Sequence, residues 1–338
     1  MHRLLRTVDQ LSADERFQAF QNRLVAKFYD ELGRGYSQAD NEVALVHRLV
    51  EAANGETYGP LHLYGSMLHG TRSYVEFNYL DKPVTKELGD MALIMVVTAG
   101  HQRLLQRITI IQNKKNSGKS WSIDQEQLFL LKNFPPFAGN KGIFQGTKDL
   151  AFRNTSGCLG SYGLLSSPGE MIFIAAPLVS EMQRGKKSVS LSDISVLSQV
   201  NSATGAEGGW GGWTWPGGIR MDSKEWYFFV QEVFHRFGPD WPMFNVLPQA
   251  SQGFLGNIRF GRDLYDLIRD FTQISIGEVC FVGQRFVNAN VDGFANLLLR
   301  AAGFGEIFEG GFDNAFGDMR FEGQMGVIVA HLDLEREG

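Results

Sequence analysis

Two long apolar segments joined by a short turn constrain the fold of this chain more than any other feature. Residues 91–98 and 104–114 are rich in apolar and β-branched side chains, and Ala99-Gly100-His101 connects them. Apolar runs of this length are typical of buried strands, and a short connection favours antiparallel pairing. The sequence therefore predicts a β-hairpin inside a sheet.

Helical and strand patterns flank this hairpin on both sides. Apolar spacing near 3.6 residues, with Gly33 and Gly35 ending the first run, predicts helices at residues 13–32, 37–53, 125–133, 223–237, 262–271 and 291–302. Further strands are predicted at residues 74–79 and 171–178. This mixture of elements indicates the α/β fold class.

A stretch rich in Gly, Asn and Ser at residues 138–167 is the expected boundary between two domains. We expect a first domain at residues 1–150 and a second, α+β domain at residues 151–338. Specificity, oligomerisation and partner binding all stay open as roles of the second domain. Within it, the glycine- and tryptophan-rich residues 208–218 could stack on bases or fill a core.

Composition excludes several classes of protein. Of the 338 residues, 43% are hydrophobic and 20% charged, which is enough apolar surface for a core and too little charge for wholesale disorder. A net charge of −5 excludes a generally basic protein but not a local basic site. Cys158 and Cys280 are too far apart in the sequence to indicate a disulfide scaffold or a zinc knuckle. Without a signal-like or bilayer-length apolar run, we expect a cytoplasmic protein with no membrane partner.

The ends of the hairpin carry a set of polar residues with complementary chemistry. Asp90 precedes the first strand, and Gln112 and Lys114 lie at the end of the second. Strand alternation puts Gln112 and Lys114 on one face, and antiparallel pairing brings Asp90 beside them. Carboxylate and amide oxygens suit Mg²⁺ or Mn²⁺, and a lysine can stabilise charge on a phosphate. The set therefore indicates phosphodiester hydrolysis.

A helix, a hairpin bearing Asp90 and Gln112-x-Lys114, and a second helix together resemble the PD-(D/E)XK nuclease superfamily. The resemblance is to the variant in which Gln replaces the acid of the last motif, and it covers about residues 37–137. It implies a restriction-endonuclease-like mixed sheet flanked by helices. It also implies that Asp90 and Gln112 bind Mg²⁺ or Mn²⁺ and that Lys114 positions the attacking water.

Glu42 looks like the metal-binding glutamate that some members carry on the first helix. It lies four residues before Val46 and seven before Leu49, so these side chains share the helix face turned toward the sheet. By the resemblance, Glu42 is the third candidate metal ligand. The activity implied is that of a magnesium-dependent DNA endonuclease in bacterial anti-phage defence or restriction, working as a homo-oligomer with a possible partner protein.

Local charge supports binding of a polyanion next to these residues. Residues 112–153 contain seven Lys or Arg and three Asp or Glu, as a groove that follows a phosphate backbone would require. The candidate nucleic-acid contacts are Lys115, Lys119, Gln125 and Gln127.

Other interpretations stay open. The chain could be a non-catalytic nucleic-acid or protein interaction module that retains the nuclease fold. Lys114 and Lys115 could simply end a strand in solvent while Asp90 caps a turn. Gly118-Lys119-Ser120 is a fragment of a phosphate-binding loop, although Asn113 stands where that pattern needs glycine.

Overall fold

A mixed, eleven-stranded sheet forms the centre of the molecule in the part of the chain that the structure describes. The structure, a computed structural model, describes residues 2–141, 150–152, 159–183, 186–191, 193, 262–283, 285–305 and 323–335. The tryptophan-rich segment 208–218 and the helix expected at 223–237 lie outside these residues.

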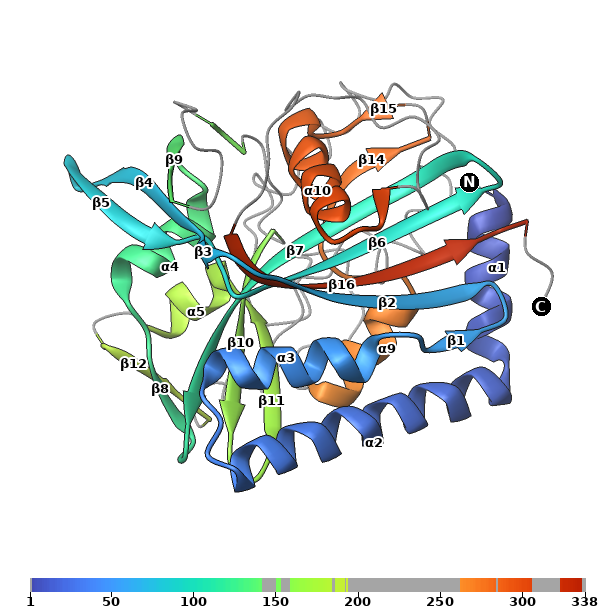
Figure 1. Cartoon of the computed structure of the whole chain (residues 1–338), viewed down its shortest axis with the longest axis horizontal. Helices are drawn as coiled ribbons and strands as arrows, with labels where there is room; N and C mark the ends of the chain where they lie inside the picture. Colours follow the sequence, from blue (N-terminus) through green and yellow to red (C-terminus); the bar gives the residue numbers. More distant parts are fainter. Residues whose placement is uncertain are drawn as a thin grey trace, which may run out of the picture.

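The main path of the sheet runs β1-β2-β16-β6-β7-β10-β11-β13 (Figure 1). In that order the strands are β1 (Thr57–Tyr58), β2 (Leu61–Leu68), β16 (Gly323–Asp333), β6 (Met91–Ala99), β7 (Gln102–Asn116), β10 (Gly160–Ser166), β11 (Glu170–Ala175) and β13 (Arg262–Asp263). Off this path, β14 (Glu278–Val282) pairs with β7 and β15 (Arg285–Phe286), and β3 (Thr71–Arg72) pairs with β16.

Two smaller sheets accompany the main one. The first has the order β5 (Lys82–Glu87), β4 (Tyr74–Tyr79) and β9 (Phe137–Lys141), and the second pairs β12 (Ser188–Ser190) with β8 (Ser120–Ser122). In Figure 1 the β4–β5 hairpin projects from the body beside helix α4 (Gln125–Asn133).

Helices pack on both faces of the main sheet. One face, called here the α2 face, buries a core shared with α1 (His2–Ala13), α2 (Glu15–Ser37), α3 (Glu42–Ala53) and α9 (Leu264–Thr272). The opposite face, the α4 face, buries a core shared with α4, α5 (Ala176–Met182) and α10 (Ala289–Ala301). None of the helices within the described ranges is long and apolar enough to cross a bilayer.

The predicted hairpin is confirmed as the antiparallel pair β6 and β7, with Met91 opposite Ile111. On its other side β7 pairs in parallel with β10, so that Gln112 lies opposite Tyr162. Strand β16 lies between β2 and β6, antiparallel to the first and parallel to the second. The α/β class with a mixed sheet flanked by helices is therefore observed.

The boundary expected near residue 150 does not divide the main sheet. Strands from both sides of residue 150 alternate in it, because β16 from the end of the chain separates β2 from β6. Both apolar cores also combine side chains from residues 1–150 and 151–338. The Gly-rich stretch at 138–167 contains β9 and β10 rather than a linker alone.

Local helix boundaries differ from the sequence prediction in physically explicable ways. Helix α2 continues through Gly33 and Gly35 to Ser37. A Cβ at Gly35 would collide with Leu45 of the neighbouring helix, so helix packing and not helix termination explains this glycine. Helix α3 starts at Glu42 because Asn41 caps it, its side chain accepting from Ala44 N at 2.9 Å.

Two other glycines allow helices to contact the sheet backbone closely. A Cβ at Gly65 of β2 would overlap the carbonyl oxygen of Val50 in α3, and a Cβ at Gly160 of β10 would overlap that of Leu131 in α4. Helix α3 therefore rests directly on the backbone of β2, and helix α4 on the backbone of β10.

We expect Gly160→Ala to lower the free energy of unfolding by about 1–3 kcal/mol, because α4 must move away from β10 to admit the methyl group. Urea unfolding followed by circular dichroism measures the change. Gly118→Ala is the matched control, since the nearest atom to its Cβ is the exposed side-chain oxygen of Asn116 at 3.3 Å. Equal stability of the two variants would contradict this close approach.

Candidate active site

Asp90 lies immediately before β6 and binds the neighbouring strand through its side chain. Its Oδ2 accepts hydrogen bonds from Gln112 Nε2 and from the backbone N–H of Asn113, both at 2.6 Å. The backbone N–H of Asp90 donates to Ile111 O at 2.9 Å and continues the ladder. Pairing between β6 and β7 stops at Met91 and Ile111. Beyond this pair, the Asp90 carboxylate takes the place of a strand backbone as the acceptor for the Asn113 N–H.

Gln112 and Lys114 point to the α4 face, as strand alternation predicts. Their partners on β10 are Tyr162 and Leu164, which both belong to the core of that face. Gln112 is 4% exposed and Lys114 is partly buried. The structure thus brings Asp90, Gln112 and Lys114 to one end of the hairpin.

Glu42 reaches the same end of β7 from the α2 face. Its Oε1 accepts from the backbone N–H of Lys115 at 2.7 Å. The N–H groups of Asn113 and Lys115 are two residues apart on one strand edge, so they lie about 7 Å apart. Asp90 binds the first and Glu42 the second. Direct ligands of Mg²⁺ lie about 2.1 Å from the ion, so the two carboxylates, held at separate N–H groups, would need to converge to share one.

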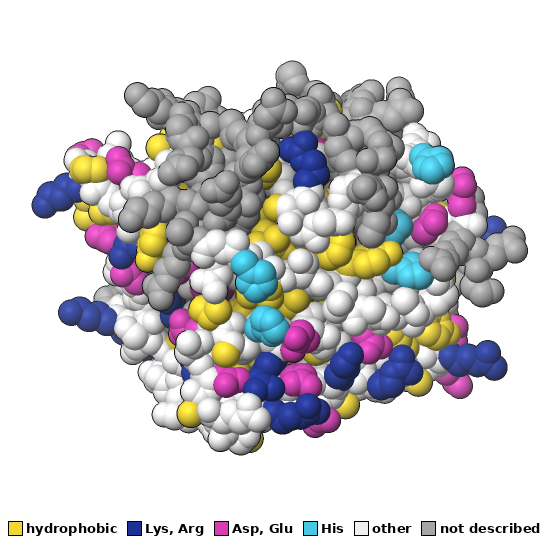
Figure 2. All heavy atoms as spheres, viewed as in Figure 1, with side chains coloured by type: hydrophobic (Ala, Val, Ile, Leu, Met, Phe, Trp, Pro, Cys, Tyr) yellow, Lys and Arg dark blue, Asp and Glu magenta, His cyan; other side chains and the backbone are white. Residues whose placement is uncertain are grey.

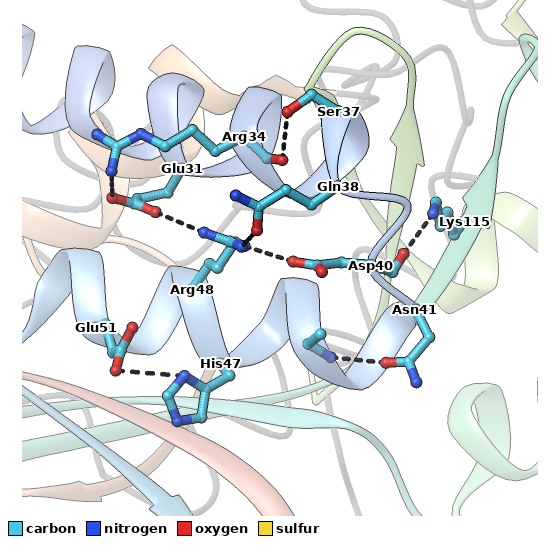
Figure 3. Close-up of polar contacts among 11 residues, drawn as sticks. Glu31, Arg34, Ser37, Gln38, Asp40, Asn41, His47, Arg48, Glu51 and Lys115 are labelled. Carbon is cyan, nitrogen blue, oxygen red and sulfur yellow. Dashed lines mark hydrogen bonds and ion pairs between the residues drawn. The ribbon is translucent and has the colours of Figure 1, made fainter.

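Lys115 is held by the connection between α2 and α3. Its ammonium donates to the carbonyl oxygen of Asp40 (Figure 3). The same ammonium lies 5.0 Å from the centre of the Tyr36 ring. Arg48 bonds the carboxylates of Asp40 and Glu31 and so fixes the same turn. These contacts give Lys115 a structural role that competes with its predicted role in nucleic-acid binding.

The other predicted nucleic-acid contacts are also engaged within the protein. Gln127 is buried and donates to Glu87 O at 2.7 Å, which holds α4 against the segment leading to Asp90. Gln125 donates to Gln183 Oε1 at 2.7 Å, and Lys119 lies 3.6 Å from a carboxylate oxygen of Glu170.

The phosphate-binding loop considered for Gly118-Lys119-Ser120 is wrong. Such a loop needs a helix that begins at the lysine. Ser120 instead begins strand β8, and α4 starts five residues later at Gln125.

The surface charge seen in Figure 2 is mixed. Lys and Arg side chains form a row along the edge where α2 and α3 lie, with Asp and Glu between them. Arg23 and Lys27 both pair with Glu56, and Arg34 pairs with Glu31. These pairs neutralise much of the row, so it is a poor candidate for a phosphate groove.

Burial raises the pKa of Asp90 to about 7, and the nearby carboxylate of Glu87 adds to the effect. The Asn113 N–H and the Lys114 ammonium act in the opposite direction, while Glu42 contributes a further small increase. When a carboxylate is costly to ionise without a bound cation, a cation placed nearby gives its ionised form the largest stabilisation. Shifts of this kind are concentrated at functional sites.

We expect the stability of the protein to fall as pH rises from 4 to 7 through Asp90. The folded state keeps the proton up to about pH 7, whereas the unfolded state releases it near pH 4. This contribution is complete below the unfolded pKa and is lost as pH rises through the folded pKa. Each pKa unit is worth about 1.4 kcal/mol, so the shift corresponds to no more than about 4 kcal/mol.

Asp90→Asn provides the measurement. The variant is neutral at every pH, so it should match the wild type near pH 4.5 and be more stable than the wild type at pH 8. Urea midpoints at the two pH values give the difference. The same stability difference at both pH values would contradict a raised pKa at Asp90.

The oxygen atoms at this end of β7 fit a hard divalent cation. Gln112 Oε1 is buried and has no hydrogen-bond partner among the described residues, although the Nε2 atom of the same amide binds Asp90. One carboxylate and one amide oxygen, with water completing the shell, are a donor set that Mg²⁺ accepts. Within the described ranges, no group of three His, Cys, Asp or Glu side chains gathers as a metal site.

Sequence reasoning missed Tyr162, which lies opposite Gln112 on the α4 face. Its hydroxyl is buried and has no hydrogen-bond partner among the described residues. Only the pairing of β10 with β7 brings it here, and no local pattern in the sequence reveals a pairing between strands 50 residues apart.

Comparison with known proteins finds no matching family model, no matching curated protein and no matching solved structure.

Proposed function

We propose that the protein is a divalent-metal-dependent nuclease that hydrolyses DNA phosphodiester bonds. The observation that carries the proposal is the convergence of Asp90, Gln112 and Lys114 at one end of the β6–β7 hairpin. An acid with a raised pKa, a buried free amide oxygen and an ammonium group are the components that metal-assisted phosphodiester hydrolysis needs.

The order of elements also supports the proposal. Helix α3, the hairpin β6–β7 and helix α4 follow one another along the chain, with α3 and α4 on opposite faces of the sheet. This is the order implied by the resemblance to PD-(D/E)XK nucleases.

Each residue has a distinct proposed role. Asp90 would bind Mg²⁺ or Mn²⁺ through oxygen, with the amide oxygen of Gln112 assisting and Glu42 as an additional carboxylate at the strand edge. When bound, the cation lowers the pKa of a coordinated water and neutralises phosphate charge. Lys114 would orient the attacking water or donate hydrogen bonds to the phosphate oxygens as negative charge develops. Gln127 keeps Asp90 in position by binding the carbonyl of Glu87.

Nicking of supercoiled plasmid in the presence of Mg²⁺ or Mn²⁺ tests the proposal. We expect the wild type to convert supercoiled plasmid to the open circle and Asp90→Asn to be inactive although it is folded. Cleavage that survives in Asp90→Asn would show that the site lies elsewhere.

A non-catalytic interaction module is the second candidate, and one observation favours it. Both acids already bind backbone N–H groups of β7, Asp90 that of Asn113 and Glu42 that of Lys115. Capping the edge of β7 that β6 leaves unpaired beyond Ile111 would be a sufficient structural role for both. DNA binding without cleavage under either cation would favour this candidate.

The setting rests on the resemblance alone. We propose a homo-oligomeric enzyme of anti-phage defence or restriction that has DNA as substrate and a partner protein of the same system.

A further inference from the structure

Two residues paired on neighbouring strands, Tyr162 and Gln112, each carry a buried polar atom that the described protein leaves unpaired. The Tyr162 side chain is fully buried and Gln112 is 4% exposed. Neither the Tyr162 hydroxyl nor Gln112 Oε1 has a hydrogen-bond partner among the described residues. Leaving such an atom unpaired costs about 1–3 kcal/mol, so buried polar atoms nearly always bind protein, water or ligand.

Strand pairing places these atoms at the candidate active site. Tyr162 of β10 is the direct partner of Gln112 of β7 across a spacing of about 4.8 Å, and both side chains point to the α4 face. The amide of Gln112 is fixed because its Nε2 donates to Asp90 at 2.6 Å. The amide group of Gln112 is therefore held beside Asp90, on the same sheet face as Tyr162.

The hydroxyl of Tyr162 is a neutral hydrogen-bond donor at ordinary pH. Burial raises the pKa of Tyr162, and the carboxylates of Asp124 and Asp90 raise it further. Asp124 caps the first turn of α4 by accepting from Gln127 N at 2.9 Å. Tyr162 and the apolar side chains of α4 belong to the same core.

We infer that Tyr162 is a positioning residue of this site: its hydroxyl and Gln112 Oε1 together bind one water molecule beside Asp90, and this water belongs to the hydration shell of a divalent cation. The inference rests on the proposed function. A hydroxyl and an amide oxygen are complementary to water, which donates to the amide and either donates to or accepts from the hydroxyl. Mg²⁺ and Mn²⁺ sites with few protein ligands retain several waters whose position must be fixed.

Removing the Tyr162 hydroxyl distinguishes a hydroxyl that binds a hydration water from one that only occupies space in the core. An unpaired hydroxyl in a core is dispensable, so a passive Tyr162 predicts that Tyr162→Phe leaves cation binding unchanged. If the hydroxyl holds a hydration water, Tyr162→Phe should weaken Mn²⁺ binding about 5- to 10-fold, the loss of one hydrogen bond. The stability of the cation-free protein should change little because the ring still fills the core.

Titration of Mn²⁺ followed by electron paramagnetic resonance measures the affinity in the full-length protein without DNA. The matched control is Tyr79→Phe, since Tyr79 packs its ring on Phe129 in the same core but lies on the β4–β5 hairpin. We expect the wild type and Tyr79→Phe to bind Mn²⁺ equally and Tyr162→Phe to bind it more weakly. Thermal unfolding of the cation-free proteins shows that all three are folded.

Equal Mn²⁺ affinity in Tyr162→Phe and the wild type would overturn the inference and leave the proposed function intact. Absence of Mn²⁺ binding in the wild type would overturn both. A double-mutant cycle with Gln112→Met adds a second criterion, because two groups that hold one water must give non-additive losses. Additive losses would contradict a shared water.

Discussion

Lys114→Met is expected to reduce metal-dependent DNA cleavage about 100- to 1,000-fold. The Lys114 side chain is on the face of Gln112 and close enough to Asp90 to lower the pKa of that carboxyl. Among the described residues its ammonium forms neither a hydrogen bond nor an ion pair, so its charge remains available for a substrate. Removing one group that stabilises developing charge costs about this factor in other hydrolases. Methionine preserves the length and apolar packing of the stem.

Lys115→Met is the matched control because adjacent strand residues point to opposite faces. The ammonium of Lys115 is used by Asp40 and Tyr36. Its loss should lower the stability of the α2–α3 turn and leave the cleavage rate within a few-fold of the wild type. Plasmid nicking at saturating Mg²⁺ measures the rates, and urea unfolding measures the stability. The reverse result, a rate loss in Lys115→Met alone, would move the active site to the α2 face.

The pH profile gives Lys114→Met an independent signature. Loss of the positive charge raises the pKa of Asp90 further. The form of Asp90 that binds a cation then appears at higher pH, so the acid limb of the residual activity should shift upward. An unchanged limb would mean that Lys114 and Asp90 do not share a site.

Local sequence signals were sufficient to predict the hairpin, helix α4 and the sheet face to which Gln112 and Lys114 point. These features depend on side-chain periodicity over a few residues and on a short turn, both of which the sequence carries directly. The cap of α4 by Asp124 is equally local. The close approach of Asp90 to Gln112 then follows from antiparallel pairing alone.

Non-local pairing explains what the sequence could not predict. Strand β16 enters the sheet between β2 and β6 although about 230 residues separate it from β6 along the chain. Its partners are specified by complementary surfaces and not by any local pattern. The same holds for Tyr162, which reaches the site through parallel pairing of β10, and for the contact of Lys115 with Asp40. A Gly-rich stretch in the sequence gives no information about such pairings, so the domain boundary inferred from it does not match the sheet.

The opposite end of β7 carries a buried ionic network that anchors helix α10 to the sheet. Arg103 donates to both carboxylate oxygens of Asp292 in α10, at 3.0 and 3.1 Å, and the two side chains are 3% and 1% exposed. Gln106 and Asn296 complete the network, bonded to each other at 2.9 Å. The guanidinium also lies 3.9 Å from the centre of the Phe281 ring.

Asp292→Leu is expected to lower the free energy of unfolding by about 3–5 kcal/mol, because the guanidinium of Arg103 stays buried after its carboxylate partner is removed. Arg103→Met combined with Asp292→Leu should recover part of this loss, since apolar side chains of similar size often replace a buried ion pair at little cost. Urea unfolding of the two single variants and the double variant gives the coupling energy. A double variant as unstable as the sum of the singles would contradict a direct interaction.

Cleavage by Asp292→Leu distinguishes this anchoring role from the chemistry at the other end of the strand. Arg103 and Lys114 are eleven residues apart on β7, which corresponds to about 35 Å of extended chain. At a temperature where Asp292→Leu is folded, its nicking rate should match that of the wild type, whereas Lys114→Met should be stable and slow. A folded Asp292→Leu that cleaves as poorly as Lys114→Met would show that the two ends of β7 are coupled. The separation of the two effects is expected because most of the strand between these positions is paired on both sides, by β6 as far as Ile111 and by β14 or β10 on the other side, and so transmits little local disorder.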